Sequence, residues 1–213
     1  GSGTDAAYAV QLTADGGYIV AGNTQSIDGD VGGTNGGVDY WVLKLDASGN
    51  IQWEQNYGGS AQDAAYSIEL TADGGYIVAG SSQSVNGDVG GNLGAQDYWI
   101  IRLNASGALL WERNYGGSNS DLARDIQRTS DGGYVVAGNS FSSDGDVAGN
   151  NGIDDCWIVK LDDSGNLQWG KVYGGISYDE AESIRQTTDG SFLIAGLTRT
   201  PEGNTGGTTI DNA

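Results

Sequence analysis

Carboxylates recur at fixed intervals in the glycine-rich segments of this 213-residue chain. In the first such segment Asp28 and Asp30 flank Gly29, and Asp39 follows nine residues after Asp30. Oxygen ligands on a loop that can wrap closely are what a hard cation such as Ca²⁺ requires. The spacing therefore predicts calcium as a candidate cofactor. The candidate ligands are Asp28, Asp30, Asp39, Asp88, Asp97, Asp144, Asp146 and Asp155.

The same acidic pair has a second interpretation that needs no metal. An Asp side chain that accepts backbone N–H groups fixes a tight turn, and such a turn recurs as regularly as a metal site would. In the last segment Glu202 and Asn204 replace the pair, and Ala213 stands at the closing position. Both interpretations stay open, and calcium sites are expected only in the first three segments.

Groups suited to catalysis are few. The chain has one cysteine and no histidine, which excludes an internal disulfide framework, a histidine-based triad and the usual zinc sites. Paired carboxylates can hydrolyse glycosides. A catalytic centre, however, needs a unique constellation, whereas these acids recur at every interval. The sequence predicts no catalytic residue, and Cys156, which replaces Tyr40 and Tyr98, is expected to be a core substitution.

Charge restricts the partners. With 28 Asp and Glu against 9 Lys and Arg, the formal net charge is −19. Such a surface repels nucleic acid and anionic membranes and attracts cations. No apolar run approaches the roughly 18 residues that a membrane-spanning helix needs. We therefore expect neither nucleic-acid binding nor membrane insertion.

The acidic segments belong to a tandem repeat. The turn that begins at Asp15 recurs at Asp73, Asp131 and Asp189, so each step is 58 residues. We expect a single repeat domain over residues 1–213. Its repeats are 1–58, 59–116, 117–174 and a partial fourth, 175–213.

Within one repeat the hydrophobic period is two, which is typical of strands. Tight turns join the first strand to the second and the third to the fourth. The sequence therefore predicts an all-β fold, a β-propeller built of four-stranded 58-residue blades, with three and a half blades and fourteen strands in this chain. An open stack of sheets is the alternative. In the second repeat the expected strands are 66–70, 76–80, 98–103 and 109–115.

Propeller geometry sorts the acids into two faces. The loop after the second strand and the loop between blades open on one face, here called the loop face, and the two tight turns lie on the other. The candidate ligands are thus expected on the loop face, and the turn acids beginning with Asp15 are expected to be structural. Four further acids are expected on the loop face: Asp5, Asp63, Asp121 and Asp179.

The tryptophans are expected in the core. Alternation places Trp41 on one face of its strand with Leu43 and Leu45, which is typical of packing between blades. Loop residues are better candidates for contact with a glycan. They are Asn35, Asn92, Asn150 and Asn151.

Three segments carry resemblances to known families. The stretch 10–22 resembles the first hairpin of a WD-repeat, and 45–53 resembles the docking motif of quinoprotein-type propellers. The whole chain is similar to a Gly/Asp-rich repeat of secreted Bacteroidetes proteins that is often found with a type IX secretion domain. That resemblance implies a secreted or cell-surface location and brings no established activity. The docking motif alone gives no ground for a quinone cofactor.

These observations predict a non-catalytic scaffold of an exported, adhesin-like protein that presents an acidic, calcium-ordered loop face. The alternative is a lectin-like propeller with one glycan site per blade, since linked weak sites gain avidity. A glycoside-active enzyme is the third hypothesis. The expected partners are a cell-surface glycan or protein, and self-association that completes the ring.

Overall fold

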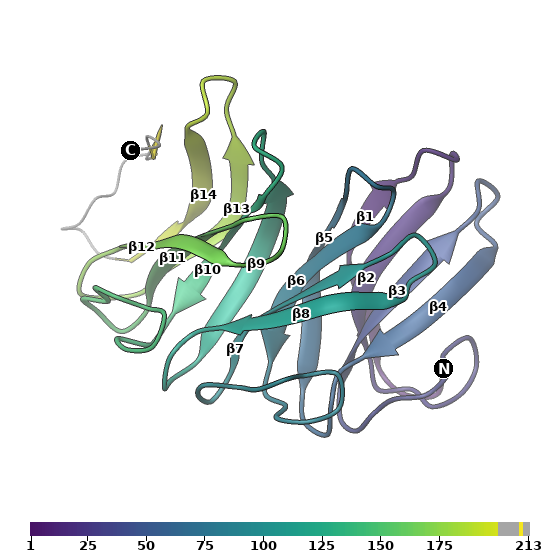
Figure 1. The fold of residues 1–213 in the computed structure, drawn as a ribbon. Coiled ribbons are helices and arrows are strands. Elements are labelled where there is room, and N and C mark those ends of the chain that lie inside the picture. Colours follow the sequence, from purple (N-terminus) through teal and green to yellow (C-terminus); the bar gives the residue numbers. More distant parts are fainter. Residues whose placement is uncertain (200–208, 211–213) are drawn as a thin grey trace. The chain divides into compact units, whose positions relative to one another are not determined.

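All regular structure in the computed structural model, which describes residues 1–199 and 209–210, is β-strand (Figure 1). Nothing in these ranges forms a helix long and apolar enough to cross a membrane. The segment around Glu202, Asn204 and Ala213 lies outside the described residues. The strands are β1 (Asp5–Leu12), β2 (Tyr18–Thr24), β3 (Asp39–Leu45), β4 (Ile51–Tyr57), β5 (Asp63–Leu70), β6 (Tyr76–Ser82), β7 (Asp97–Leu103), β8 (Leu109–Tyr115), β9 (Asp121–Arg128), β10 (Tyr134–Ser140), β11 (Asp155–Leu161), β12 (Leu167–Tyr173), β13 (Asp179–Gln186), β14 (Phe192–Thr198) and β15 (Thr209–Ile210).

Each of the first three repeats forms one four-stranded antiparallel sheet in which neighbours in sequence are neighbours in space. The sheet orders are β1-β2-β3-β4, β5-β6-β7-β8 and β9-β10-β11-β12. The fourth sheet contains β13 and β14, to which the two-residue β15 pairs through Phe192 and Ile210. The predicted all-β fold with four-stranded repeat units is confirmed, and β1–β14 are the fourteen strands that the sequence predicts.

The sheets belong to two compact units. Unit 1 consists of residues 1–92 and 98–114, which hold the first two sheets apart from the first residue of β7 and the last residue of β8. Unit 2 consists of residues 93–97 and 115–213, with the third and fourth sheets. The segment 93–97 thus leaves the second repeat and packs with the third. A single domain over 1–213 stays a prediction.

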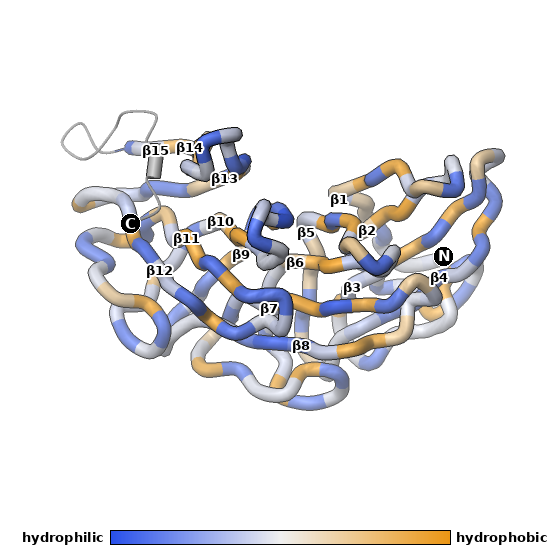
Figure 2. The backbone as a smooth tube through the Cα atoms, turned by 45° about the horizontal axis from the view of Figure 1, so that its top comes forward, coloured by the Kyte–Doolittle hydropathy of each residue, from blue (hydrophilic) through white to orange (hydrophobic). Residues whose placement is uncertain are grey.

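The second strand of each inner sheet is apolar because both of its faces are covered. Every residue of β6 and of β10 is buried, whereas the outer strands β4 and β8 are only partly buried. Figure 2 shows apolar residues concentrated along the strands and hydrophilic residues in the connections. The nearly continuous apolar run at 76–80 predicts this decrease in burial from the inner to the outer strands.

A glycine in each second strand allows a bulge in the strand beside it. Gly80 pairs with Ala65, and the β5 register shifts directly after that pair, between Ala65 and Ser67. A Cβ at Gly80 would overlap the carbonyl oxygen of Ala64 and lie 2.6 Å from Tyr40 Oη. Only glycine fits this close backbone approach. The first and fourth sheets repeat the arrangement at Gly22 and Gly196.

In unit 1 the core lies between the two sheets. Tyr40 on β3 packs against Trp99 on β7 with ring centroids 4.5 Å apart, and its hydroxyl donates to the Trp99 carbonyl at 2.8 Å. Ile19 on the first sheet and Ile68 on the second belong to the same buried cluster. The tryptophan is therefore a packing residue, as the alternation of β3 and β7 predicts.

Unit 2 has an equivalent core between the third and fourth sheets. Trp169 meets Phe192 edge-on at 6.0 Å, and Cys156 packs beside Val135 and Ile158. Burial raises the pKa of the Cys156 thiol to about 12, so the reactive thiolate is rare at neutral pH. Cys156 is thus the core substitution that the sequence predicts.

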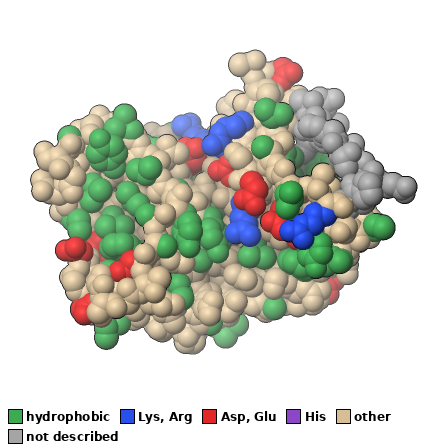
Figure 3. Space-filling model, turned by 180° about the vertical axis from the view of Figure 1, so that it is seen from behind, with side chains coloured by type: hydrophobic (Ala, Val, Ile, Leu, Met, Phe, Trp, Pro, Cys, Tyr) green, Lys and Arg blue, Asp and Glu red, His purple; other side chains and the backbone are tan. Residues whose placement is uncertain are grey.

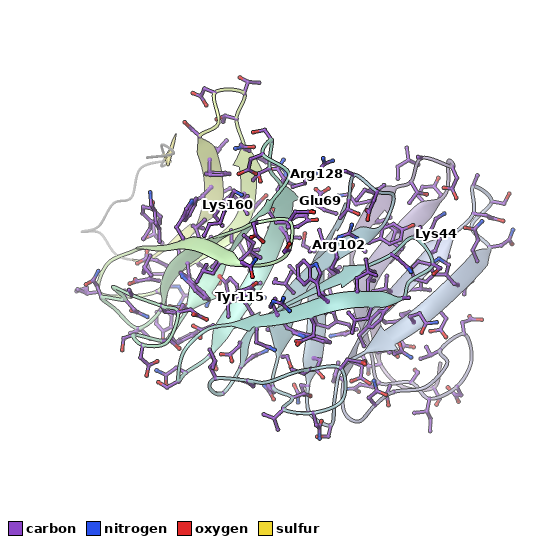
Figure 4. All side chains as sticks on the ribbon, viewed as in Figure 1. Lys44, Glu69, Arg102, Tyr115, Arg128 and Lys160 are labelled. Atoms are coloured by element: carbon purple, nitrogen blue, oxygen red, sulfur yellow. The ribbon has the colours of Figure 1, made fainter. Side chains whose placement is uncertain are left out.

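A buried basic residue recurs on the third strand of each complete sheet (Figure 4). Its partner is the Asp of the first tight turn, and the Nζ–Oδ2 distance for Lys44 and Asp15 is 2.8 Å. The hydrogen bond from Lys44 holds the pKa of Asp15 well below its usual range. These turn acids are therefore structural, as the sequence predicts. The pairs are Lys44–Asp15, Arg102–Asp73 and Lys160–Asp131.

Candidate functional site

The side chain at the first position of each predicted pair accepts a hydrogen bond from a backbone amide. Asp28 Oδ1 accepts a hydrogen bond from the Ser2 amide at 2.6 Å. In the second repeat Asn86 accepts from Ser60 at 2.8 Å, and in the third Asp144 makes the same bond. Because an uncharged Asn does the same work, this position does not need a negative charge. The contact is the one expected of the turn interpretation.

The second acid of the pair reaches the connection between two sheets. Asp88 Oδ2 accepts from the Gly58 amide at 3.2 Å, and the Asp88 amide donates to the Gly58 carbonyl at 3.0 Å. Asp146 holds Gly116 in the same way, at 3.3 and 2.8 Å. Asp30 occupies the corresponding position in the first repeat and is exposed. These carboxylates join one repeat to the next.

The closing acid of each loop is completely buried. In unit 1, Asp39 Oδ2 accepts from the Asn35 amide, while its Oδ1 has no hydrogen-bond partner among the described residues. In unit 2, Asp97 and Asp155 likewise use one oxygen for a loop amide and leave the other unbonded within the part of the chain that the structure describes. A buried acceptor without a donor is costly, so each of these three oxygens needs a donor or a cation beyond the groups that the described residues supply.

Asp39 meets acids of the next repeat. A Cβ at Gly58 would overlap Asp39 Oδ1 and lie 2.6 Å from Asp63 Oδ2, so two carboxylates flank this glycine. Asp63 is also buried and accepts from the Gly59 amide and the Ser84 hydroxyl, both at 2.8 Å. We call these acids, with the acid that holds the glycine amide, the junction carboxylates. They are Asp39, Asp63 and Asp88 in unit 1, and Asp97, Asp121, Asp146, Asp155 and Asp179 in unit 2.

The sequence groups the acids by loop, but the structure groups them by junction. Asp39 lies with Asp63 and Asp88 of the following repeat, and the charges of both raise its pKa. The Asp28 carboxylate instead binds Ser2 at the start of its own repeat. One signal could have revealed the junction: a Gly-Gly step recurs with the 58-residue period. The steps are 58–59, 116–117 and 174–175.

Burial dominates the electrostatics of the junction. It raises the pKa of Asp39 to about 6, the hydrogen bond from the Asn35 amide opposes the shift, and the negative charges of Asp63 and Asp88 add to it. Burial likewise raises the pKa of Asp97 to about 6. The junction is therefore a place where a proton binds more tightly than in water.

The oxygen ligands of the junction are of the type that binds a hard cation, but their side chains do not converge on one point. Carboxylate and carbonyl oxygens are what Ca²⁺ prefers. As they lie, however, no three acidic or cysteine side chains within the described ranges converge closely enough to hold a metal ion. Binding therefore requires the side chains of Asp39, Asp63 and Asp88 to turn toward the ion.

The predicted glycan-contacting asparagines differ among themselves. The Asn92 amide group donates to the Ser82 carbonyl at 2.9 Å, and Asn150 makes the corresponding bond in the third repeat. Asn35 and Asn151 are exposed. Asn92 and Asn150 therefore shape the loop from within. The exposed Asn35 donates its amide group to Asp88 Oδ2 at 3.3 Å and to the Gly58 carbonyl at 3.4 Å, so its side chain belongs to the junction, whereas Asn151 lies open to solvent.

An open groove that the sequence does not predict lies in unit 1, near the tight turns. It measures about 440 Å³, and Trp53 and Tyr76 lie on its wall with ring centroids 5.9 Å apart. Thr13, Gln52 and Ser106 supply polar groups. The arrangement pairs an aromatic surface with polar side chains, which is the usual composition of a small-ligand site.

Glu54 also has a structural role that the sequence does not predict. Its Oε2 accepts from the Trp41 indole at 3.0 Å, and its Oε1 accepts from the Gly32 amide at 2.9 Å. Glu112 binds Trp99 in the second sheet at 3.0 Å. The bond from Gly32 to Glu54 links the outer strand β4 to the loop. The 58-residue spacing of Glu54 and Glu112 is the sequence signal that could have revealed these residues.

Sequential four-stranded antiparallel sheets with 58-residue spacing define this chain as a propeller-type repeat protein. No model of a known protein family matches the sequence. The regulatory protein FlaEY of Caulobacter vibrioides is 26% identical over 135 residues, which are 58% of this chain. The match covers only 14% of the length of that relative.

Two solved structures are similar in fold at 12% identity. A protein of unknown function from Bacteroides caccae matches 92% of this chain and 72% of its own, with a TM-score of 0.40. The Pan2 WD40 domain of Neurospora crassa matches 96% of this chain and 60% of its own, with a TM-score of 0.48. The fold assignment itself rests on the order and pairing of the strands.

Proposed function

We propose that this chain is a non-catalytic repeat scaffold of an exported, adhesin-like protein, and that its loops present an acidic surface ordered by calcium. The observation that carries the proposal is the clamp that recurs at the first two junctions. Asp88 and Asp146 bind the backbone of the connecting glycines Gly58 and Gly116. Acids that join repeats in this way favour a rigid, modular scaffold over a unique catalytic centre.

The export and adhesion parts of the proposal are supported by sequence. The net charge of −19 keeps the surface hydrated. The resemblance to repeats of secreted proteins, which rests on the sequence alone, implies export. The partner that suits such a surface is a cell-surface glycan or protein. Calcium would also lower the repulsion between neighbouring carboxylates.

The calcium part of the proposal is supported by the buried oxygens. Asp39, Asp97 and Asp155 each carry an oxygen without a hydrogen-bond partner in the described ranges. An ion at the junction would satisfy that oxygen together with Asp63 or its equivalents. Because the side chains must rearrange, we expect a weak site, with a dissociation constant of roughly 0.1–1 mM as in other extracellular modules.

Thermal unfolding in calcium and in EDTA tests this proposal. At about ten times the dissociation constant, a ligand that binds only the folded state adds about 1.4 kcal/mol per site. We therefore expect the melting temperature to rise by several degrees in calcium. Equal melting temperatures in the two buffers would remove calcium from the proposal and leave a scaffold held by hydrogen bonds alone.

A matched pair of variants locates the ion. Asp88→Asn with Asp146→Asn keeps an acceptor for the glycine amides but removes two junction charges, so the calcium shift should shrink. Asp28→Asn with Asp144→Asn changes the other acid of each pair to the residue that Asn86 already supplies. This control should keep the full shift. The reverse result would place the ion within each loop rather than at the junction.

Lectin-like glycan binding is the second candidate function, and the groove in unit 1 favours it. Sugars present an apolar face and a rim of hydroxyls, which suits the partly exposed Trp53 ring and the polar side chains of Gln52 and Ser106, with the buried Tyr76 behind the tryptophan. Glycan-array binding by the labelled chain tests this candidate.

Removing one groove side chain should weaken such binding. Gln52→Ala deletes one hydrogen bond of about 0.5–1.5 kcal/mol, so affinity should fall about two- to tenfold. Gln55→Ala, on the same strand but outside this groove, is the matched control and should bind as the unmodified chain does. An array without hits, or equal loss in both variants, would exclude the groove as a glycan site.

A further inference from the structure

The first sheet has an apolar face that no other sheet covers in unit 1. Val10, Leu12 and Tyr18 on β1 and β2 are 61%, 66% and 39% exposed. Figure 3 shows that hydrophobic side chains lie open on the surface of the molecule. We call these three residues the leading face, because they lie on the side from which a preceding repeat would pack.

The positions of Val10 and Tyr18 are buried where another sheet packs on them, and Leu70, the counterpart of Leu12, is partly buried. In the second sheet Ile68 and Tyr76, which correspond to Val10 and Tyr18, are 1% and 3% exposed, and they belong to the core shared with the first sheet. In unit 2 the equivalent Ile184 is 0% exposed against the third sheet. The leading face is therefore one half of the joint that links consecutive repeats.

The fourth sheet exposes the other half. Leu193 and Leu197 on β14 are 51% and 47% exposed. The residue equivalent to Leu193 in the first sheet is Ile19, which is 0% exposed and packs in the core against the second sheet. We call Leu193 and Leu197 the trailing face.

We propose that the leading face of one chain binds the trailing face of a second copy of this chain, head to tail. The proposal continues an established interface, because the chain already forms the same joint between its own first and second sheets and between its third and fourth. A partner with the same repeat offers at Leu193 the type of residue that Ile19 supplies in the existing joint, whereas the counterpart of Leu197 in the first sheet is the polar Asn23. It follows from the exposed faces and does not depend on calcium or on glycan binding.

The exposure of the residues beside the leading face supports a second copy as the partner. Trp41 and Leu45 are partly exposed on the same sheet face, whereas their counterparts Trp99 and Leu103 are 0% exposed in the joint. A head-to-tail contact is heterologous, so the copies close into a ring if the rotation between them allows it, and otherwise each end keeps a free half and association continues.

Sedimentation of the 213-residue chain from about 1 to about 200 µM tests the proposal, a range suited to an interface of modest affinity. We expect the mean mass to rise above the 21.9 kDa of one chain as concentration increases. A leading-face variant, Val10→Lys with Leu12→Lys, and a trailing-face variant, Leu193→Lys with Leu197→Lys, should each remain at the mass of one chain. Because all four side chains are exposed, both variants should keep the melting temperature of the unmodified chain.

Mixing the two variants gives the decisive result. The leading-face variant retains an intact trailing face, and the trailing-face variant retains an intact leading face. An equimolar mixture should therefore form a complex of one copy of each, and no larger species. A mixture that stays at the mass of one chain, or an unmodified chain that does not associate at the highest concentration, would overturn the proposal.

Discussion

Replacing Gly80 by alanine is expected to destabilise the protein by about 3 kcal/mol or more, although only a methyl group is added. The new Cβ would overlap the Ala64 carbonyl oxygen and lie 2.6 Å from Tyr40 Oη. Neither neighbour can withdraw freely. Ala64 lies in β5, beside the bulge that this glycine accommodates, and the Tyr40 hydroxyl is bound to Trp99. Urea unfolding followed by tryptophan fluorescence measures the change.

Gly91→Ala is the matched control for this prediction. A Cβ at Gly91 would have no heavy atom within 4 Å, and its φ lies outside the left-handed region. The same chemical change should therefore shift the unfolding free energy by less than about 0.5 kcal/mol. Equal effects at Gly80 and Gly91 would show that the strand relaxes around the methyl group and that the close approach does not require glycine.

Replacing Asp39 by asparagine is expected to stabilise the protein at pH 8 in EDTA by about 2–3 kcal/mol. Burial raises the pKa of Asp39 to about 6, above its value in the unfolded chain. The stability that this carboxyl contributes is thus complete below about pH 4 and is lost as the pH rises through 6. Asparagine keeps an acceptor for the Asn35 amide and carries no charge to bury.

The pH dependence distinguishes this effect from a simple repacking. The difference between the Asp39→Asn variant and the unmodified chain should be small below pH 4, where the acid is protonated in both states, and should grow between about pH 4 and 6. Chemical unfolding at a series of pH values gives both curves. Asp28→Asn is an exposed control whose pKa is lowered rather than raised, so it should not reproduce the gain in stability that Asp39→Asn shows as the pH rises. A variant less stable than the unmodified chain at pH 8 would show that the Asp39 charge is favourable in the folded state.

The fold was largely predictable because its signals are local and repeated. The period-two alternation, the Asp-Gly turns and the 58-residue spacing each fix one strand or one hairpin, and they agree with one another. The burial of Trp99 follows from alternation along β7 in the same way. The alternation does not predict which sheet packs on which face, because both faces of an inner strand are apolar.

The candidate site was less predictable because it is assembled across repeats. Asp39 and Asp88 are far apart in sequence, and the residue between them in space is Gly58. A search for ligands within one loop cannot find such a group. The basic residues were missed for a related reason: Lys44 lies in an apolar strand, and its partner Asp15 belongs to a hairpin turn.

The division of each junction between two repeats has a consequence for how such a chain can change its length. One repeat supplies the acid equivalent to Asp39, and the next supplies those equivalent to Asp63 and Asp88. If a DNA segment of one 58-residue period is duplicated or deleted, the repeats that become neighbours still supply the two halves of a junction, wherever the ends of the segment fall. Genes for these repeats can therefore gain or lose whole modules by unequal recombination and still pair the acids of neighbouring repeats.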